Sequence, residues 1–284
     1  MRKPIAIITL SLALLALAAI ASHGQQPDGA AAWLDRGREL ASHGDFPGAL
    51  NALDKAIALD STIAEAYALR GAIFDEIGQP GRAISDFSKA IRLNKNNPAF
   101  HNGRGLALSH IDDLERAVYD FTQAIKLKPD YVEAFINRGA VWVRLNDYDR
   151  ALKDFSKAIE LEPRAADAYN NRGFVYLNRG DLKQAEADFN RSLELEPNDP
   201  FALLNRGTAR LKAGNLTGAE QDLTRALEID PNSAETYYLR AVTRMKSGNI
   251  KGAMADADKA VNLDPSSPVY KKLTEELRPK NQTQ

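Results

Sequence analysis

The sequence contains no cysteine, only 4 histidines and 2 tryptophans, and its charged residues nearly cancel to a net charge of -1. Without cysteine the chain has no disulfide, no thiolate metal site and no thiol for lipid modification. Acidic and basic residues are interspersed along every 34-residue repeat of the chain, so no segment marks a surface for nucleic acid or anionic lipid. We therefore expect no nucleic-acid partner.

Residues that could carry catalysis are also scarce. The histidines are His23, His43, His101 and His110, and no two stand at the spacing of a helical metal-binding pair. His101 takes an aromatic packing position, and only His110 is expected to face a groove. No phosphate-binding loop or nucleotide fingerprint is present. We predict a protein without enzyme activity, cofactor, metal or small-molecule substrate.

The one long apolar run stands at the start of the chain. Residues 5–21 follow two basic residues, contain only two polar side chains and end in small residues. This layout is typical of a secretory signal over residues 1–21, with a linker at 22–29. A run of about 17 residues also lies at the lower edge of a membrane span, so a retained signal anchor is the alternative. We expect an exported protein, periplasmic or secreted, or anchored in the inner membrane.

A glycine recurs every 34 residues through most of the chain. The series is Gly37, Gly71, Gly105, Gly139, Gly173 and Gly207, with Ala241 as its seventh member. The period defines seven units over residues 30–267, namely 30–63, 64–97, 98–131, 132–165, 166–199, 200–233 and 234–267. A separate catalytic domain needs at least about 50 residues, and no stretch of that length is left over.

Each unit has the pattern of two helices joined by a turn. In 132–165, Phe135, Gly139 and Trp142 share one helical face, and a second apolar stripe follows before Pro163 ends it. A single helix hairpin cannot bury both of its apolar faces, so the units must stack. We predict an all-α, right-handed superhelical solenoid of seven helix-turn-helix units, a capping helix at 268–279 and a disordered tail at 280–284.

The fifth unit carries a recognisable motif: Tyr169, Gly173, Tyr176, Ala185, Phe189 and Pro197. At this spacing the set resembles the tetratricopeptide repeat, and the match extends over all seven units. The resemblance implies that the first helix of each unit lines a concave face that binds protein or an extended peptide. Departures fall mainly at the ends, where Ser61 and Lys95 replace the terminal proline and Ala257 replaces an aromatic residue.

An arginine precedes the recurring small residue in every unit, and an aspartate stands sixteen residues later in six of them. The predicted pairs include Arg104 with Asp120, Arg138 with Asp154, Arg172 with Asp188, and Arg206 with Asp222. Such a pair would tie the first helix to the second. The alternative is an arginine row exposed to acidic ligands. Because Ala52 replaces the aspartate in the first unit, Arg36 is expected to lack a partner if pairing stays within the unit.

The resemblance also places candidate binding residues on the first helices. Asn137, Asn171 and Asn205 are spaced by 34 residues, and Asn102 and Asn170 stand one position earlier in their units. The row resembles the asparagine ladder in the enzyme that attaches N-acetylglucosamine to nuclear and cytoplasmic proteins, where it holds a peptide backbone. Arg144, Phe174 and Asn178 are further candidates. The alternative is that these amides bond to local backbone or to solvent.

Two functions follow from these patterns. The first is an exported, non-enzymatic interaction scaffold that binds an extended peptide or a partner protein in the concave groove, centred on residues 132–233. The alternative is a membrane-tethered architectural component of an envelope secretion or polysaccharide-export assembly. A membrane contact is expected only if residues 1–21 are retained as an anchor.

Overall fold

The structure is a computed structural model in which residues 29–278 are described. The predicted signal at 1–21 and the predicted tail at 280–284 lie outside these residues, as does nearly all of the linker. The described residues fall into two compact units, residues 29–161 and residues 162–278.

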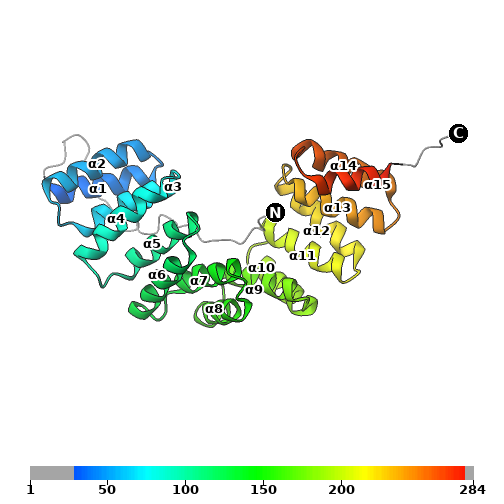
Figure 1. The fold of residues 1–284 in the computed structure, drawn as a ribbon, viewed down its shortest axis with the longest axis horizontal. Helices are drawn as coiled ribbons and strands as arrows, with labels where there is room; N and C mark the ends of the chain where they lie inside the picture. The colour runs from blue at the N-terminus through cyan, green and yellow to red at the C-terminus, as the bar shows by residue number, and fades with distance from the viewer. Residues whose placement is uncertain (1–28, 279–284) are drawn as a thin grey trace. The chain divides into compact units, whose positions relative to one another are not determined.

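The N-terminal unit consists of four antiparallel helix pairs. Its helices are α1 (Ala30–Ser42), α2 (Phe46–Leu59), α3 (Ala64–Glu76), α4 (Pro80–Leu93), α5 (Pro98–His110), α6 (Leu114–Leu127), α7 (Val132–Arg144) and α8 (Tyr148–Leu161). Each odd-numbered helix packs most extensively on the even-numbered helix that follows it, and each pair packs on the next (Figure 1). Contacts are therefore local, as expected of a repeat stack.

The C-terminal unit repeats the same arrangement three times and adds one helix. Its helices are α9 (Ala166–Arg179), α10 (Leu182–Leu195), α11 (Pro200–Lys212), α12 (Leu216–Ile229), α13 (Ala234–Lys246), α14 (Ile250–Leu263) and α15 (Pro268–Leu277). The last helix buries Tyr270, Leu273 and Leu277 and packs mainly on α14. Four of its exposed positions carry lysine or glutamate, so it closes the stack with a mostly polar surface.

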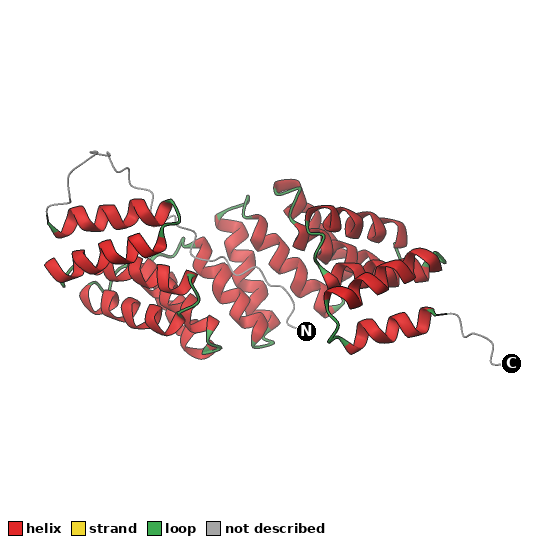
Figure 2. Cartoon of the chain, turned by 90° about the horizontal axis from the view of Figure 1, so that it is seen from above, coloured by secondary structure: helices red, strands yellow, loops and turns green. Residues whose placement is uncertain are grey.

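The all-α class and the stacking of helix hairpins are confirmed, because residues 29–278 contain fifteen helices and no strand (Figure 2). Among these helices, none combines the length and the apolar character needed to cross a bilayer.

The turn inside each hairpin depends on a left-handed residue. Glycine takes this conformation in most pairs, for example Gly78 at φ 75° and Gly180 at φ 85°. Asp112 and Asn146 take it in the third and fourth pairs, at φ 66° and φ 61°. These residue types adopt left-handed backbone at the least cost, so the turn can be short.

The recurring glycine lets the two helices of a pair approach closely. A Cβ atom at Gly139 would lie 2.6 Å from Phe155 Cε1, and one at Gly173 would lie 2.8 Å from the same atom of Phe189. The seventh pair has alanine at both places, Ala241 and Ala257, so extra volume on one helix is matched by lost volume on the other.

Candidate binding surface

Six of the seven repeated arginines fork onto an aspartate of the same hairpin. Arg138 Nε lies 2.8 Å from Asp154 Oδ2, and Arg138 Nη2 lies 2.7 Å from Asp154 Oδ1. The same two-bond geometry joins Arg70 to Asp86, Arg104 to Asp120, Arg172 to Asp188, Arg206 to Asp222, and Arg240 to Asp256. Parallel bonds to a carboxylate fix the guanidinium in one orientation.

The free end of the guanidinium reaches the preceding hairpin. Arg104 Nη1 donates to Ser88 Oγ at 3.1 Å, and Arg138 Nη1 donates to Thr122 Oγ1 at 3.0 Å. The corresponding acceptors are Asp54 for Arg70, Asn190 for Arg206 and Thr224 for Arg240. One arginine therefore joins three helices, which favours a structural role over a site for acidic ligands.

Arg36 departs from this pattern, as the absence of an aspartate at position 52 predicts, but it does have a partner. Its Nη1 donates to Glu39 Oε2 at 2.7 Å, on its own helix and in an exposed position. The expectation of an arginine without a partner is therefore wrong, because a neighbour one helical turn away is in reach.

Burial and pairing act in opposite directions on the aspartates. Burial raises the pKa of Asp120, but hydrogen bonds from Arg104 and His101 outweigh it and leave the pKa below its usual value. Asp120 is 1% exposed, and His101 Nδ1 lies 3.5 Å from its Oδ1. His101 thus packs inside the hairpin stack, as its sequence position indicates.

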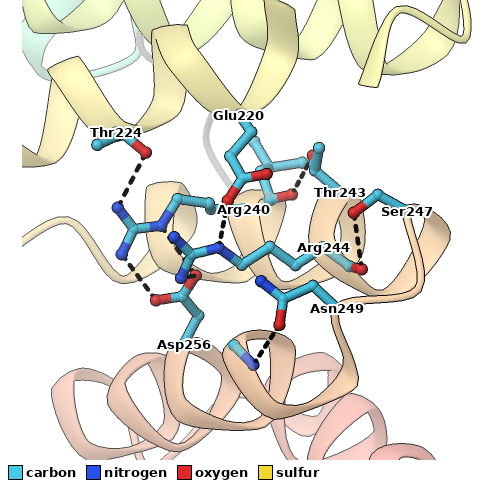
Figure 3. Close-up of polar contacts among 10 residues, drawn as sticks. Glu220, Thr224, Arg240, Thr243, Arg244, Ser247, Asn249 and Asp256 are labelled. Atoms are coloured by element: carbon cyan, nitrogen blue, oxygen red, sulfur yellow. Dashed lines mark hydrogen bonds and ion pairs between the residues drawn. The ribbon is translucent and has the colours of Figure 1, made fainter. Parts of the chain in front are cut away.

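The C-terminal unit contains a second set of arginines (Figure 3). Arg244 donates to Glu220 at 2.6 Å and to Asp256 at 2.9 Å, so Asp256 is shared with Arg240. The hairpin before it repeats the arrangement, with Arg210 bound to Glu186 and Asp222. Earlier repeats hold apolar pairs at these places, such as Phe74 with Leu50. The signal for these ion pairs in the sequence is an arginine and a glutamate 24 residues apart, at two positions that are apolar in the earlier repeats, and the repeat pattern alone does not predict it.

The candidate asparagines are buried, which differs from the expected open row. Asn102, Asn137, Asn170 and Asn171 are at most 2% exposed, and Asn205 is 5% exposed. Asn137 Nδ2 donates to Asn102 Oδ1 at 3.3 Å, and Asn205 Nδ2 donates to Asn170 Oδ1 at 3.0 Å. Each of these two bonds joins neighbouring hairpins, because residues 35 positions apart lie side by side on successive first helices.

One of these amides is incompletely satisfied. Asn137 Oδ1 is buried and has no hydrogen-bond partner in the structure. Burial and the charge of Glu133 raise the pKa of Tyr131, close to Asn102, to about 12. An unpaired buried acceptor carries a free-energy cost that a donor from a ligand or water would remove.

The remaining candidates also make internal bonds. Arg144 donates to the Ser109 carbonyl oxygen and to Asp112 Oδ1, both at 2.7 Å. Asn178 donates to the Phe174 carbonyl oxygen at 2.7 Å, and Phe174 is 6% exposed. His110 Nδ1 lies 2.9 Å from Asp75 Oδ1, and hydrogen bonding to Asp75 raises the pKa of His110. Arg144 and His110 thus connect the ends of successive first helices.

Nothing in residues 29–278 gathers three or more histidine, aspartate or glutamate side chains into a possible metal site. The polar residues described above bind one another, and their arrangement offers no nucleophile beside a general base. What the arrangement can supply is a row of packed helices with few unsatisfied polar atoms.

Family models described as "Tetratricopeptide repeat" match residues 10–62, 34–98 and 69–132, residues 166–199, and residues 210–277. A further model described as "TPR repeat" matches residues 142–180. No match was found among curated proteins.

Solved structures of similar fold include a tetratricopeptide repeat protein from Parabacteroides merdae, at 21% identity and a TM-score of 0.67, covering 87% of this chain and 98% of that one. YrrB, a TPR protein with an unusual peptide-binding site, is 27% identical with a TM-score of 0.54, covering 66% of this chain and 97% of that one. The APC/C hetero-tetramer Cut9–Hcn1 contains a chain at 15% identity and a TM-score of 0.73. The match covers 88% of this chain but only 52% of that larger one.

Proposed function

Because the chain belongs to the tetratricopeptide repeat family, whose fold suggests a protein-interaction scaffold, we propose that it is an exported, non-enzymatic scaffold that binds an extended peptide segment of a partner protein along its first helices. The observation that carries the binding site is the buried, unpartnered Asn137 Oδ1 on α7. A backbone N–H of an extended segment is the donor that would complete it. The peptide-binding site of YrrB, at 27% identity, supports the same class of ligand.

We expect a bound peptide to break the hydrogen bond between the side-chain amides of Asn137 and Asn102. The bond between Asn137 and Asn102 is long, at 3.3 Å, and its replacement by bonds to a peptide backbone costs little. Hydrogen bonds to a peptide backbone do not depend on the side chains of the peptide, so they allow many peptide sequences to bind. Other side chains on the first helices would therefore select the partner. Export rests on the signal pattern of residues 1–21.

The test is affinity capture from envelope extract with the wild-type protein, Asn137→Ala and Asn205→Ala. Both variants lose one amide bond between neighbouring hairpins, so their structural cost is matched. Only Asn137→Ala removes an oxygen that is both fully buried and without a hydrogen-bond partner. We expect bound proteins, identified by mass, to be lost from Asn137→Ala and retained by Asn205→Ala, with circular dichroism showing that all three proteins fold.

Equal capture by all three proteins would refute the site at Asn137 and favour the architectural alternative, in which other faces bind. Export is tested separately by N-terminal sequencing of the protein recovered from its source cells. A mature chain that begins after residue 21 supports a cleaved signal, whereas a chain that retains Met1 supports an anchor.

A further inference from the structure

The second helices of the N-terminal unit carry all their lysines and arginines on one face. The face consists of four positions per helix at i, i+3, i+7 and i+10, which lie on one side of an α-helix. The positions are Gly48, Asn51, Lys55 and Ala58 on α2, Arg82, Ser85, Lys89 and Arg92 on α4, Arg116, Tyr119, Gln123 and Lys126 on α6, and Arg150, Lys153, Lys157 and Glu160 on α8. We call this set the outer stripe, and all sixteen residues are exposed or half-exposed.

The outer stripe contains many more cations than acids, although the composition of the whole chain is nearly neutral. The four helices contain nine lysines and arginines, all in the outer stripe, and seven acids, of which only Glu160 is in it. Three of the other acids are Asp86, Asp120 and Asp154, which are buried and neutralised by arginines of the first helices. Three of the seven acids are thus buried and all nine cations lie on the surface, while Asp54, Glu115 and Asp149 are exposed on the same helices outside the stripe.

Most of these cations have no acidic partner. Six of the nine make no ion pair in the described structure, namely Lys55, Arg82, Lys89, Arg92, Lys126 and Lys153. Arg116, Arg150 and Lys157 pair only with residues three positions away, and such exposed pairs contribute little. Tyr119 stands among the cations with 60% of its surface exposed.

The corresponding face of the C-terminal unit is different. Its twelve positions are Gln184, Ala187, Arg191 and Glu194 on α10, Gly218, Gln221, Arg225 and Glu228 on α12, and Gly252, Ala255, Lys259 and Asn262 on α14. They hold three cations and two acids, and Arg191 and Arg225 each pair with one of those acids. The strongly basic face is therefore a property of the N-terminal unit and not of the repeat in general.

We propose that the outer stripe docks on the surface of a bilayer that contains anionic lipids. Unpaired lysines and arginines are attracted to such a surface, and each contributes roughly fivefold in affinity. A tyrosine exposed among them suits the boundary between headgroups and acyl chains. The apolar run that ends at residue 21 lies only eight residues before the described structure begins, so its insertion would bring the first hairpins to the same surface.

The test is co-sedimentation of the full chain with vesicles of phosphatidylcholine alone or with about one-third phosphatidylglycerol. The stripe variant is Arg82→Glu, Lys89→Glu and Arg92→Glu. The control is Arg191→Glu, Arg225→Glu and Lys259→Glu, which makes the same charge change at three surface positions of the C-terminal unit, each equivalent to Lys89 in its repeat. The apolar run and its two basic residues are unchanged in all three proteins, so their contribution cancels.

We expect the wild-type protein and the control to bind the anionic vesicles at least tenfold more tightly than the neutral ones, with the preference lost in high salt. The stripe variant should lose that preference while its circular dichroism is unchanged. Equal preference in all three proteins, or none in the wild type, overturns the proposal. Stripe-dependent binding of poly-glutamate or an RNA oligonucleotide, without binding of anionic vesicles, also overturns it, because the face would then serve another polyanion.

Discussion

Arg138 donates two parallel hydrogen bonds to Asp154, from Nε at 2.8 Å and from Nη2 at 2.7 Å. Asp154 is 5% exposed, so Asp154→Ala leaves a guanidinium without its carboxylate in a mostly dry site. Breaking a buried pair costs about 3 to 5 kcal/mol, and we expect the lower end because Arg138 keeps its bond to Thr122. Denaturant unfolding followed by circular dichroism measures the loss.

The control for this substitution is Lys153→Ala, which changes the charge of the same helix at an exposed position without an ion pair. It should alter the free energy of unfolding by less than about 0.5 kcal/mol. If the two variants unfold together with the wild type, the arginine and aspartate series does not stabilise the stack.

The first hairpin has alanine at position 52, where the other hairpins have the aspartate, so here an ion pair can be added instead of removed. In Ala52→Asp, we expect Arg36 to leave Glu39 and fork onto the new carboxylate, as the other six arginines do. A double-mutant cycle with Arg36→Ala isolates the pair, and its coupling energy should be about 1 to 3 kcal/mol. A coupling energy near zero would show that the first hairpin cannot adopt the shared geometry.

The regular spacing of the units made the hairpins predictable, because helix period, turn residue and close-approach glycine all recur with the same register. The side-chain network was only partly predictable. Pairing of Arg138 with Asp154 follows from their positions within one hairpin, but the bond to Thr122 depends on how two hairpins stack. Its signal was present as a polar residue sixteen positions before most of the arginines.

Two further differences between the sequence-based predictions and the structure arise from which side chains are buried. From the family resemblance we expect Asn137 to line a groove, yet its amide reaches Asn102 on the neighbouring first helix. Sequence spacing does not show which way a side chain points. Likewise, a list of charges cannot reveal the outer stripe. Only the structure shows that Asp86, Asp120 and Asp154 are inside while the cations of the same helices are outside.

Close packing of the recurring glycine predicts a position-dependent effect of alanine. A Cβ atom at Gly139 would lie 2.6 Å from Phe155, so Gly139→Ala should destabilise the protein by about 1 to 3 kcal/mol. Gly81 lies in α4 with nothing within 4 Å of an added Cβ atom. Gly81→Ala should therefore stabilise by up to about 1 kcal/mol, since alanine is the better helix former. Thermal melts that shift in the same direction would contradict this reading.

His110 predicts a dependence of stability on pH. Its Nδ1 lies 2.9 Å from Asp75 Oδ1 and joins the end of α5 to the end of α3. Hydrogen bonding to Asp75 raises the pKa of His110 most, the charges of Asp75 and Glu76 add to this, and burial and Arg144 oppose it. Because the folded pKa is above the unfolded value of about 6.5, the stabilisation is complete below that value and is lost as the pH rises through the folded pKa.

Subtracting the melting temperature of His110→Gln from that of the wild type isolates this contribution, since every other titrating group is common to both proteins. The difference should be largest near pH 6 and shrink as the pH rises through the raised pKa of His110. His43→Gln is the control, because His43 bonds to the Glu39 carbonyl oxygen and has no carboxylate partner. A His110 difference that stays constant over this range would mean that the imidazole acts by packing alone, since only an ionic contact with Asp75 responds to its protonation.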